Sequence, residues 1–410
     1  MVRINQHFLK LHNYFLFTEI AQRAERFLQK HPDVTLFKLG IGDTTEPLPQ
    51  SVITGLKRGV EKLSNKKTYV GYGDERGEIA LRKGFVSWYQ EHGVSLDADE
   101  IFISDGAKTD LANIPSLFHQ RCIIAVQDPV YPMYVDSNVI YGRTGKYKNG
   151  RYKKVVYMPC VKENNFVPSL PKTRVDLIYL CMPNNPTGSI MTKKQLAEFV
   201  AYAKQHKAII IFDTAYAAFV QDPKLPRSIY EIPGAKQCAI EINSFSKSAG
   251  FTGVRMGWTV VPKDLRVEDA IPGEVNALWK RRQATMFNGV SHITQEGALG
   301  LLTKQGQKEC HDITQYYLEN ARLIRATLTQ LGFEVFGGEN APYLWVETPK
   351  GLSSWEFFDL LLEKAHIVVT PGVGFGPHGE GYVRFSSFGH RETIQEAVKS
   401  LQKASLLQKI

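Results

Sequence analysis

The segment from Ser244 to Trp258 carries the densest set of side chains that could do chemistry. Two hydroxyls, a lysine and an arginine stand there among closely spaced glycines: Ser244, Ser246, Lys247 and Arg255. Hydroxyl and guanidinium groups donate hydrogen bonds to phosphate oxygens, and glycines let the backbone approach a ligand closely. The segment therefore predicts a phosphate-binding loop, with Ser244, Ser246 and Arg255 as donors.

Lys247 lies in the middle of this loop. Taken alone it would be an ordinary solvated lysine, because most lysines are exposed. Within the frame Ser-x-Ser-Lys-x-x-Gly-x-x-Gly-x-Arg-x-Gly, we instead predict an amine that bonds a carbonyl carbon as a Schiff base. The loop would then hold a cofactor that has both a phosphate and a carbonyl group.

Short apolar runs, separated by helix-like stretches, must position these side chains. Each run ends near Gly, Pro, Asn or Asp, which predicts an α/β fold with a buried, mainly parallel sheet. Ligands collect beyond the carboxyl ends of parallel strands, so the residues that follow each run are the candidates for chemistry. The predicted strands are Ile101–Ser104, Cys122–Val126, Leu177–Cys181, Ala208–Phe212 and Cys238–Ile242.

The character of the sequence changes near Gly289. Long helical stretches such as Ile313–Leu331 follow, with a strand-like run at Tyr343–Glu347 and a glycine-rich loop at Pro371–Gly381. We predict a large domain at 46–288 and a smaller α+β domain at 289–410. Residues 1–45 lie outside the strand-helix alternation, and we expect them to form an arm and part of the small domain.

Other polar residues follow the predicted strands in a fixed order. Asp213 closes the run Ala208–Phe212 and precedes Lys247 by 34 residues, and Asn185 follows Leu177–Cys181. Together with the lysine loop, this order resembles the fold-type I, aspartate-aminotransferase-like enzymes that use pyridoxal phosphate (PLP). The resemblance covers nearly the whole chain. It implies a PLP-dependent aminotransferase with a large domain, whose mixed, mainly parallel sheet is flanked by helices, and a smaller α+β domain.

The resemblance implies roles for three polar residues around the cofactor ring. Asp213 would pair with the pyridine nitrogen and keep it protonated, which makes the ring an electron sink. Tyr216 and Asn185 would donate to the phenolic oxygen. Other interpretations stay open for each residue alone: a helix cap for Asp213, a core tyrosine for Tyr216, and a plain turn for Asn185 in Asn-Pro-Thr-Gly.

Four more residues match positions of the family. The segment Ser104–Thr109 follows a strand and opens a helix, so the amides of Ala107 and Lys108 would hold phosphate, although a bare helix start is the alternative. Tyr131 would stack on the cofactor ring, or would be an ordinary turn tyrosine. Arg384 would hold the substrate α-carboxylate with its planar fork, or would be a surface strand residue.

Five further segments resemble one branch of this family, the diaminopimelate aminotransferases. They are Leu39–Pro47, Gly71–Glu75, Ala125–Pro129, Thr285–Gly289 and Phe385–His390. The resemblance implies amino transfer from glutamate to tetrahydrodipicolinate, which gives LL-2,6-diaminopimelate and 2-oxoglutarate for lysine and cell-wall synthesis. The substrate has a second amino-carboxylate end, so the distal pocket needs an anion for its ammonium and donors for its carboxylate.

By the same resemblance, several residues bind this distal end or come from a second subunit. Glu75 of the neighbouring subunit would supply the anion, and Lys108 with backbone near Gly42 the donors. Tyr72 would reach the partner's phosphate, and Asn288 would face cofactor and substrate. These roles imply a homodimer with shared active sites. Without the resemblance, Glu75 would be interpreted as an ordinary exposed acidic residue.

One position departs from the branch. The pattern Asn-Tyr-Leu-Phe appears here as Asn13-Tyr-Phe-Leu-Phe17, which puts Phe15 at the place of a substrate-contacting tyrosine. Either a slip of one residue presents Tyr14 there, or a hydroxyl contact is lost.

The composition of the chain limits the classes of protein to which it can belong. The 410 residues are 43% hydrophobic and 22% charged, which is typical of a globular protein, and no apolar run reaches the roughly 20 residues of a membrane-spanning helix. The N-terminus lacks a signal-peptide pattern, so we expect a cytoplasmic protein that does not bind membranes.

The net charge of +9 is spread along the chain, which argues against nucleic-acid binding. The five scattered cysteines do not have metal-ligand spacing, so no metal site is expected.

Three rival functions stay open. An aminotransferase for another amino acid would not need Glu75. A PLP-binding regulatory protein would bind the cofactor without turnover. A decarboxylase or lyase on the same scaffold is the third, because the residues do not show which bond of the substrate is aligned for cleavage.

Overall fold

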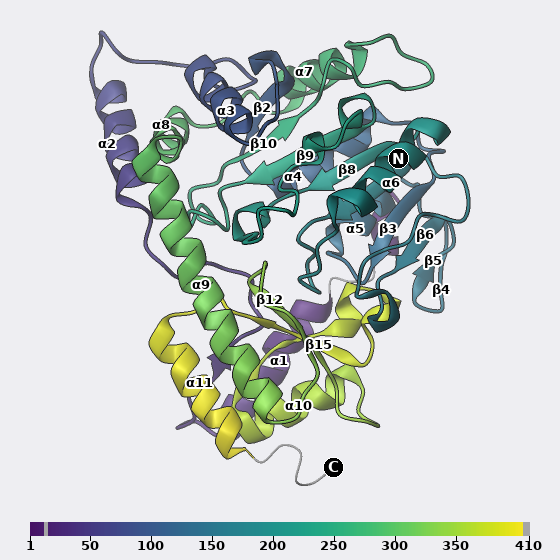
Figure 1. Ribbon diagram of the computed structural model, residues 1–410, viewed down its shortest axis with the longest axis vertical. Helices are drawn as coiled ribbons and strands as arrows, with labels where there is room; N and C mark the ends of the chain where they lie inside the picture. The colour runs from purple at the N-terminus through teal and green to yellow at the C-terminus, as the bar shows by residue number, and fades with distance from the viewer. Residues whose placement is uncertain (12–14, 405–410) are drawn as a thin grey trace.

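A seven-stranded sheet forms the upper layer of the molecule, and a four-stranded sheet lies below it (Figure 1). The structure is a computed structural model, and it describes residues 1–11 and 15–404, without the side chain of Phe15. In spatial order, the strands of the large sheet are β2 (Ile101–Ser104), β10 (Gly257–Val260), β9 (Ala239–Ser244), β8 (Ile209–Asp213), β7 (Leu177–Cys181), β3 (Ile124–Asp128) and β6 (Val155–Pro159).

Burial on both faces explains the apolar runs of this sheet. In β8, Ile209 and Ile211 join one core, whereas Ile210 and Phe212 join the other. The first core also contains residues of α4 (Ala107–Asn113), α5 (Met133–Ile140) and α7 (Glu274–Met286), and the second contains the apolar face of α6 (Lys193–His206). A strand that is covered on both sides needs apolar residues at consecutive positions.

The prediction of an α/β fold with a mainly parallel sheet is confirmed. Strands β9, β8, β7, β3 and β6 pair in parallel, and β10 alone runs antiparallel to its neighbours β2 and β9. The carboxyl ends of β3, β7, β8 and β9 therefore lie along one edge. All five predicted strands are present, with bounds shifted by at most two residues at either end.

The second sheet is antiparallel and has the order β11 (Val335–Gly337), β12 (Tyr343–Glu347), β15 (Tyr382–Ser386), β14 (Thr370–Pro371). Its core includes residues of α9 (Lys304–Gln330), α10 (Ser354–Ala365) and α11 (Arg391–Lys403). The long helix α9 runs from the upper layer down beside this sheet (Figure 1).

Part of the N-terminal segment packs with this lower layer. Strand β1 (Phe37–Lys38) pairs in parallel with β13 (Ile367–Val368), and α1 (Phe15–Lys30) packs Phe27 into the same core. In the upper layer, α2 (Gln50–Ser64) packs on α8 (His292–Leu301), where a side chain at Gly55 would lie 2.2 Å from the Glu296 carbonyl. The domain limits near residues 45 and 288 stay a prediction.

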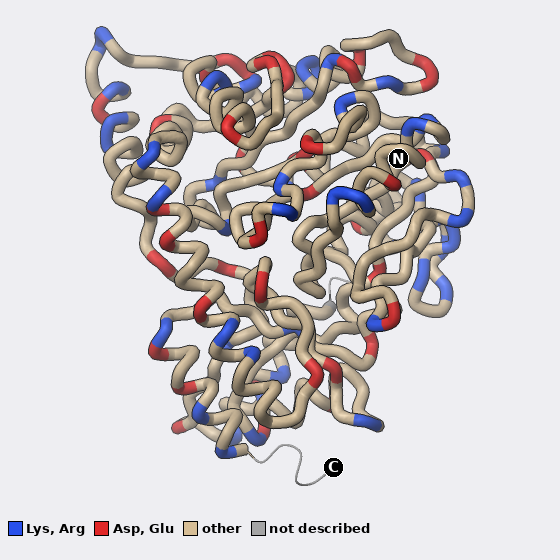
Figure 2. The backbone as a smooth tube through the Cα atoms, in the orientation of Figure 1, with Lys and Arg blue, Asp and Glu red and all other residues tan. Residues whose placement is uncertain are grey.

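The remaining elements are α3 (Ile79–Glu91) and the hairpin of β4 (Tyr147–Lys148) and β5 (Arg151–Tyr152), with short 3-10 turns between elements. Figure 2 shows Lys and Arg distributed over the whole chain and interspersed with Asp and Glu. Among the described residues, none of the helices has the length and apolar character needed to cross a membrane.

Candidate active site

A cavity of about 810 Å³ opens at the carboxyl edge of the large sheet and reaches the second sheet. Strand ends and the loops after them contribute most of its polar lining, as expected for a parallel sheet. Most of the candidate residues from the sequence line this one cavity: Gly42, Ala107, Lys108, Tyr131, Asn185, Asp213, Tyr216, Ser244, Ser246, Lys247, Arg255 and Arg384.

Lys247 lies in the turn that follows β9. Its Nζ donates to the carbonyl oxygen of Gly42 and lies 5.6 Å from the ring centroid of Phe388. Burial lowers the pKa of Lys247 to about 8; Asp43 opposes this shift, and the cations Arg384 and Arg255 add to it. The amine therefore exists largely without its proton under mildly basic conditions, as a nucleophile requires.

Asp213 is the last residue of β8, and its carboxylate is buried at the cavity wall. Tyr134 donates its hydroxyl proton to Oδ2 over 2.7 Å, and the amide of Ala215 donates to Oδ1 over 3.0 Å. Burial raises the pKa of Asp213, and the bonds from Ala215 and Tyr134 counteract that rise. Asp213 thus caps its local turn and also presents a carboxylate to the cavity.

Arg384, on β15, brings the second sheet to the cavity. Its Nη1 donates to Asn185 Oδ1 over 2.7 Å, and its Nη2 donates to the carbonyl of Gly40 over 2.6 Å. The guanidinium carbon lies 4.3 Å from the ring centroid of Tyr343, whose hydroxyl is 2.8 Å from that of Tyr216. Arg384 Nε is buried without a hydrogen-bond partner among the described residues. A buried arginine with unused donor capacity is suited to bind a carboxylate.

The loop between β2 and α4 meets the lysine loop closely. Gly106 has φ +137°, and a side chain there would lie 2.5 Å from Arg255 Nη2. Behind the loop, Asp110 Oδ2 accepts from Ser104 Oγ and Thr259 Oγ1, each over 2.6 Å, which fixes α4 against β2 and β10.

Several donors of this junction are unused in the described part of the chain. The amides of Ala107 and Lys108, at the start of α4, have no acceptor there, and neither do the hydroxyls of Ser244 and Ser246. With the guanidinium of Arg255, these donors form a concave set that would receive an anion.

Two tyrosines of the site were absent from the sequence prediction. Tyr134 lies in the first turn of α5, three residues after Tyr131. Because residues three apart on a helix are neighbours, this spacing from a predicted site residue could have identified Tyr134 from the sequence. Tyr343 begins β12 and reads as a core residue in sequence. The pairing of β12 with β15 brings Tyr343 to Arg384, and only the packing of the two sheets brings it to Tyr216.

Three candidate residues do not line this cavity: Tyr72, Glu75 and Asn288. Tyr72 is 89% exposed in the segment between α2 and α3, and Asn288 is exposed just after α7. A side chain at Gly289 would lie 3.5 Å from the Cα of Glu75, so the two segments are adjacent. Tyr14 and the side chain of Phe15 lie outside the described residues, and their alternative stays open.

Comparison with known proteins gives this arrangement a family. The model of the family described as "Aminotransferase class I and II" matches residues 34–401. The chain belongs to the class I and II aminotransferases. This match contains both sheets and all twelve candidate residues that line the cavity.

Relatives of this aminotransferase are similar over their full length. A protein of Phocaeicola vulgatus named LL-diaminopimelate aminotransferase is 50% identical over 98% of this chain and 99% of its own. A protein of Lawsonia intracellularis with the same name is 48% identical over 99% of this chain and 100% of its own.

Solved structures support the fold of this aminotransferase. L,L-diaminopimelate aminotransferase from Chlamydomonas reinhardtii superposes with a TM-score of 0.93 and 47% identity, over 98% of both chains. A single mutant of Thermus thermophilus aspartate aminotransferase has a TM-score of 0.83 at 20% identity, over 98% of this chain and 100% of its own, which shows the fold alone.

The class I and II aminotransferases use PLP, and the cavity fits this group. PLP carries a phosphate, an aldehyde and a ring nitrogen. The unused donors around Arg255 suit the phosphate, the amine of Lys247 suits the aldehyde, and the buried carboxylate of Asp213 suits the nitrogen. PLP dependence, expected from the sequence, is confirmed by the family.

Proposed function

We propose that this aminotransferase transfers the amino group of glutamate to tetrahydrodipicolinate, giving LL-2,6-diaminopimelate and 2-oxoglutarate. The amino-transfer part is supported by the shared cavity of Lys247 and Arg384, an amine of lowered pKa and a buried guanidinium. The choice of substrate is supported by one observation: relatives with this activity in their names are about 50% identical over nearly the whole chain.

Lys247 and Asp213 carry the proposed chemistry. PLP, when bound, supplies an aldehyde that bonds amines and a ring that accepts electrons from the carbon beside the amine. Lys247 Nζ, once released from the cofactor, moves the proton from the α-carbon of the amino acid, a task for which a pKa of about 8 is suitable. Asp213 keeps the proton on the ring nitrogen, because its carboxylate in a buried site favours a neighbouring cation.

Other residues hold the cofactor in this proposal. Ser244, Ser246, Arg255 and the amides of Ala107 and Lys108 bind the phosphate, and Tyr72 of a second subunit adds a hydroxyl. Tyr131 stacks on the cofactor ring, and Tyr216 and Asn185 donate to its phenolic oxygen. Asn185 Oδ1 already accepts from Arg384, so its amide nitrogen is the group directed at the cofactor.

Arg384 positions the substrate. Its planar fork binds the α-carboxylate, and Asn185 and Tyr131 line the same end of the cavity. At the distal end, Lys108 and the backbone at Gly42 donate to the second carboxylate, and Glu75 of a second subunit binds the second amino group. Asn288 faces both cofactor and substrate. The chain thus works as a homodimer with shared active sites in the cytoplasm.

The test is a transamination assay with purified enzyme and PLP, in which LL-diaminopimelate and 2-oxoglutarate yield glutamate. The meso isomer and aspartate serve as comparison substrates. We expect LL-diaminopimelate to give the highest kcat/KM of the three. No glutamate from LL-diaminopimelate, or a faster reaction with aspartate, would contradict the proposed substrate while leaving the aminotransferase family intact.

A further inference from the structure

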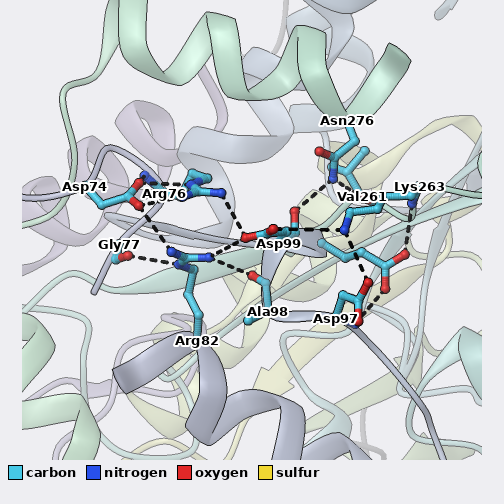
Figure 3. A network of polar contacts seen from close by, with 11 residues as sticks. Asp74, Arg76, Gly77, Arg82, Asp97, Ala98, Asp99, Val261, Lys263 and Asn276 are labelled. Atoms are coloured by element: carbon cyan, nitrogen blue, oxygen red, sulfur yellow. Dashed lines mark hydrogen bonds and ion pairs between the residues drawn. The ribbon is translucent and has the colours of Figure 1, made fainter. Parts of the chain in front are cut away.

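The segment between α2 and α3 changes character at Asp74. Before it, the chain runs as an extended strap across the outside of the molecule (Figure 1), with Tyr72 exposed and open space around Gly71. From Asp74 onward, the same segment is tied to the body by a network of charged side chains (Figure 3).

Arg82 of α3 is the centre of that network and is only 1% exposed. Its guanidinium donates to the carbonyls of Gly77 over 3.0 Å and Ala98 over 2.9 Å. It also donates to Asp74 Oδ2 and Asp99 Oδ1, each over 3.2 Å. A buried guanidinium with four acceptors fixes the backbone on both sides of it, because each lost contact would leave a buried donor unpaired.

Arg76 closes the network from the other side. Its Nε and Nη2 donate to the two oxygens of Asp74 over 3.0 and 2.7 Å, and its Nη1 donates to Asp99 over 2.9 Å. Glu75 lies between these two anchored residues and makes no hydrogen bond or ion pair with the described part of the chain. Its backbone is thus held while its carboxylate stays available.

The neighbouring segment is tied to the same place. The buried amide of Gln295 accepts from the amide of Glu78 over 2.7 Å and donates to the carbonyl of Val290 over 3.0 Å. Gln295 therefore joins the segment that follows Glu75 to the segment that follows Asn288.

We propose that Arg82 is a positioning residue for substrate choice: through Asp74 and the Gly77 carbonyl it fixes the direction of Glu75 toward the substrate's second amino group in the partner's site. This inference rests on the proposed function. A carboxylate that recognises an ammonium must lie at hydrogen-bond distance, and a displacement of about 1 Å can cost as much as 100-fold in rate. Arg82 is almost fully buried in α3, yet its guanidinium donates to the segment that carries Glu75, and this role accounts for that arrangement.

The test compares two substrates in Arg82→Lys, which keeps the charge and loses the fork. The kcat/KM for LL-diaminopimelate should fall by about tenfold or more. The half-reaction with glutamate, followed by the cofactor absorbance, should fall much less, because glutamate has no second amino group. The matched control is Lys263→Met, which breaks ion pairs with Asp97 and Asp99 at the far end of the network and should leave both substrates unaffected.

A double variant separates positioning from general damage. If Arg82 acts through Glu75, Arg82→Lys combined with Glu75→Ala should be no worse toward LL-diaminopimelate than Glu75→Ala alone. Additive losses, or equal losses for both substrates, would overturn the inference. If Arg82→Lys does not fold, Asp74→Asn, at a partly exposed side chain, gives the same comparison. A wild-type enzyme without diaminopimelate turnover contradicts the proposed function, whereas an active wild type with unaffected variants contradicts only the role of Arg82.

Discussion

If Lys247 bonds the cofactor as proposed, the environment of its amine sets the pH at which the enzyme can capture PLP. Burial and the cations Arg384 and Arg255 favour the neutral amine, so its pKa falls from the ordinary 10.5 to about 8. Only the neutral amine attacks an aldehyde, so the rate of attack rises with pH and levels off once the pKa is passed.

We predict that the rate at which the cofactor-free enzyme captures PLP rises with pH and levels off above a pH near 8. Stopped-flow absorbance measures this rate. Arg384→Met removes one of the cations and should move the plateau to higher pH. A rate that keeps rising toward pH 10.5 would mean that Lys247 has the pKa of a solvated lysine.

Tyr134 supports Asp213 through a single hydrogen bond. Tyr134→Phe removes the donor to Asp213 Oδ2, so the pKa of Asp213 should rise further and the acidic limb of the pH–activity profile should move to higher pH. A bond to a charged group of this kind corresponds to a loss of about tenfold in kcat. Tyr179→Phe is the control, because its buried hydroxyl accepts from Asn138 and makes no hydrogen bond with Asp213. Equal losses in both variants would contradict the role given to Tyr134.

The loop between β2 and α4 depends on Gly106. Its φ of +137° and ψ of 152° lie in a region that only glycine adopts without strain. Gly106→Ala should lower the free energy of unfolding by about 1–3 kcal/mol and, by displacing Arg255, should weaken PLP binding.

Urea unfolding and a PLP titration measure these two effects of Gly106→Ala. Gly93→Ala is the matched control, since Gly93 also has a positive φ, of +76°, and open space around it. It should lose stability without losing cofactor affinity. Equal PLP affinity in the two variants would show that the approach of Gly106 to Arg255 does not matter for the phosphate site.

Five strands of the large sheet could be predicted because each of these five is buried on both faces. Leu177–Cys181 is apolar throughout for this reason, and its bounds are those of β7. β10 was missed because Gly257–Val260 continues a glycine-rich segment that reads as a loop, and it becomes a strand by pairing with β2 and β9. β6 was missed because Val155–Pro159 forms the edge of the sheet and is only partly buried.

The candidate site could be predicted where a motif carries several residues at once. Lys247 and Arg255 belong to one loop, and for this reason they could be predicted to line the same cavity. The contact of Arg384 with Asn185 joins residues 199 positions apart, and the family resemblance, rather than any local pattern, indicated that they meet. Tyr343 had neither a motif nor a resemblance to mark it.

The whole molecule is proposed to work as a dimer whose active sites use both chains. Tyr72, Glu75 and Asn288 lie outside the cavity of their own chain, which supports this proposal. Hybrid dimers test it. Lys247→Ala and Glu75→Ala chains should each be poorly active with LL-diaminopimelate, but dimers that contain one of each should regain activity, because one site then combines an intact Lys247 with an intact Glu75.

The hybrids can be formed by unfolding and refolding a mixture of the two variants and isolated by two different affinity tags. Each variant unfolded and refolded by itself, which gives only homodimers, is the control. If Glu75 acted within its own chain, the hybrid would have no complete site and would gain nothing over the controls.

The bond between Lys247 and the cofactor is the central claim, and it can be measured directly. Borohydride reduction of the enzyme loaded with PLP makes that bond permanent, and digestion followed by mass spectrometry identifies the modified peptide. We predict a single pyridoxyl group on Lys247. A label on another lysine of the cavity, such as Lys108, or no label at all in an enzyme that binds PLP, would contradict the account.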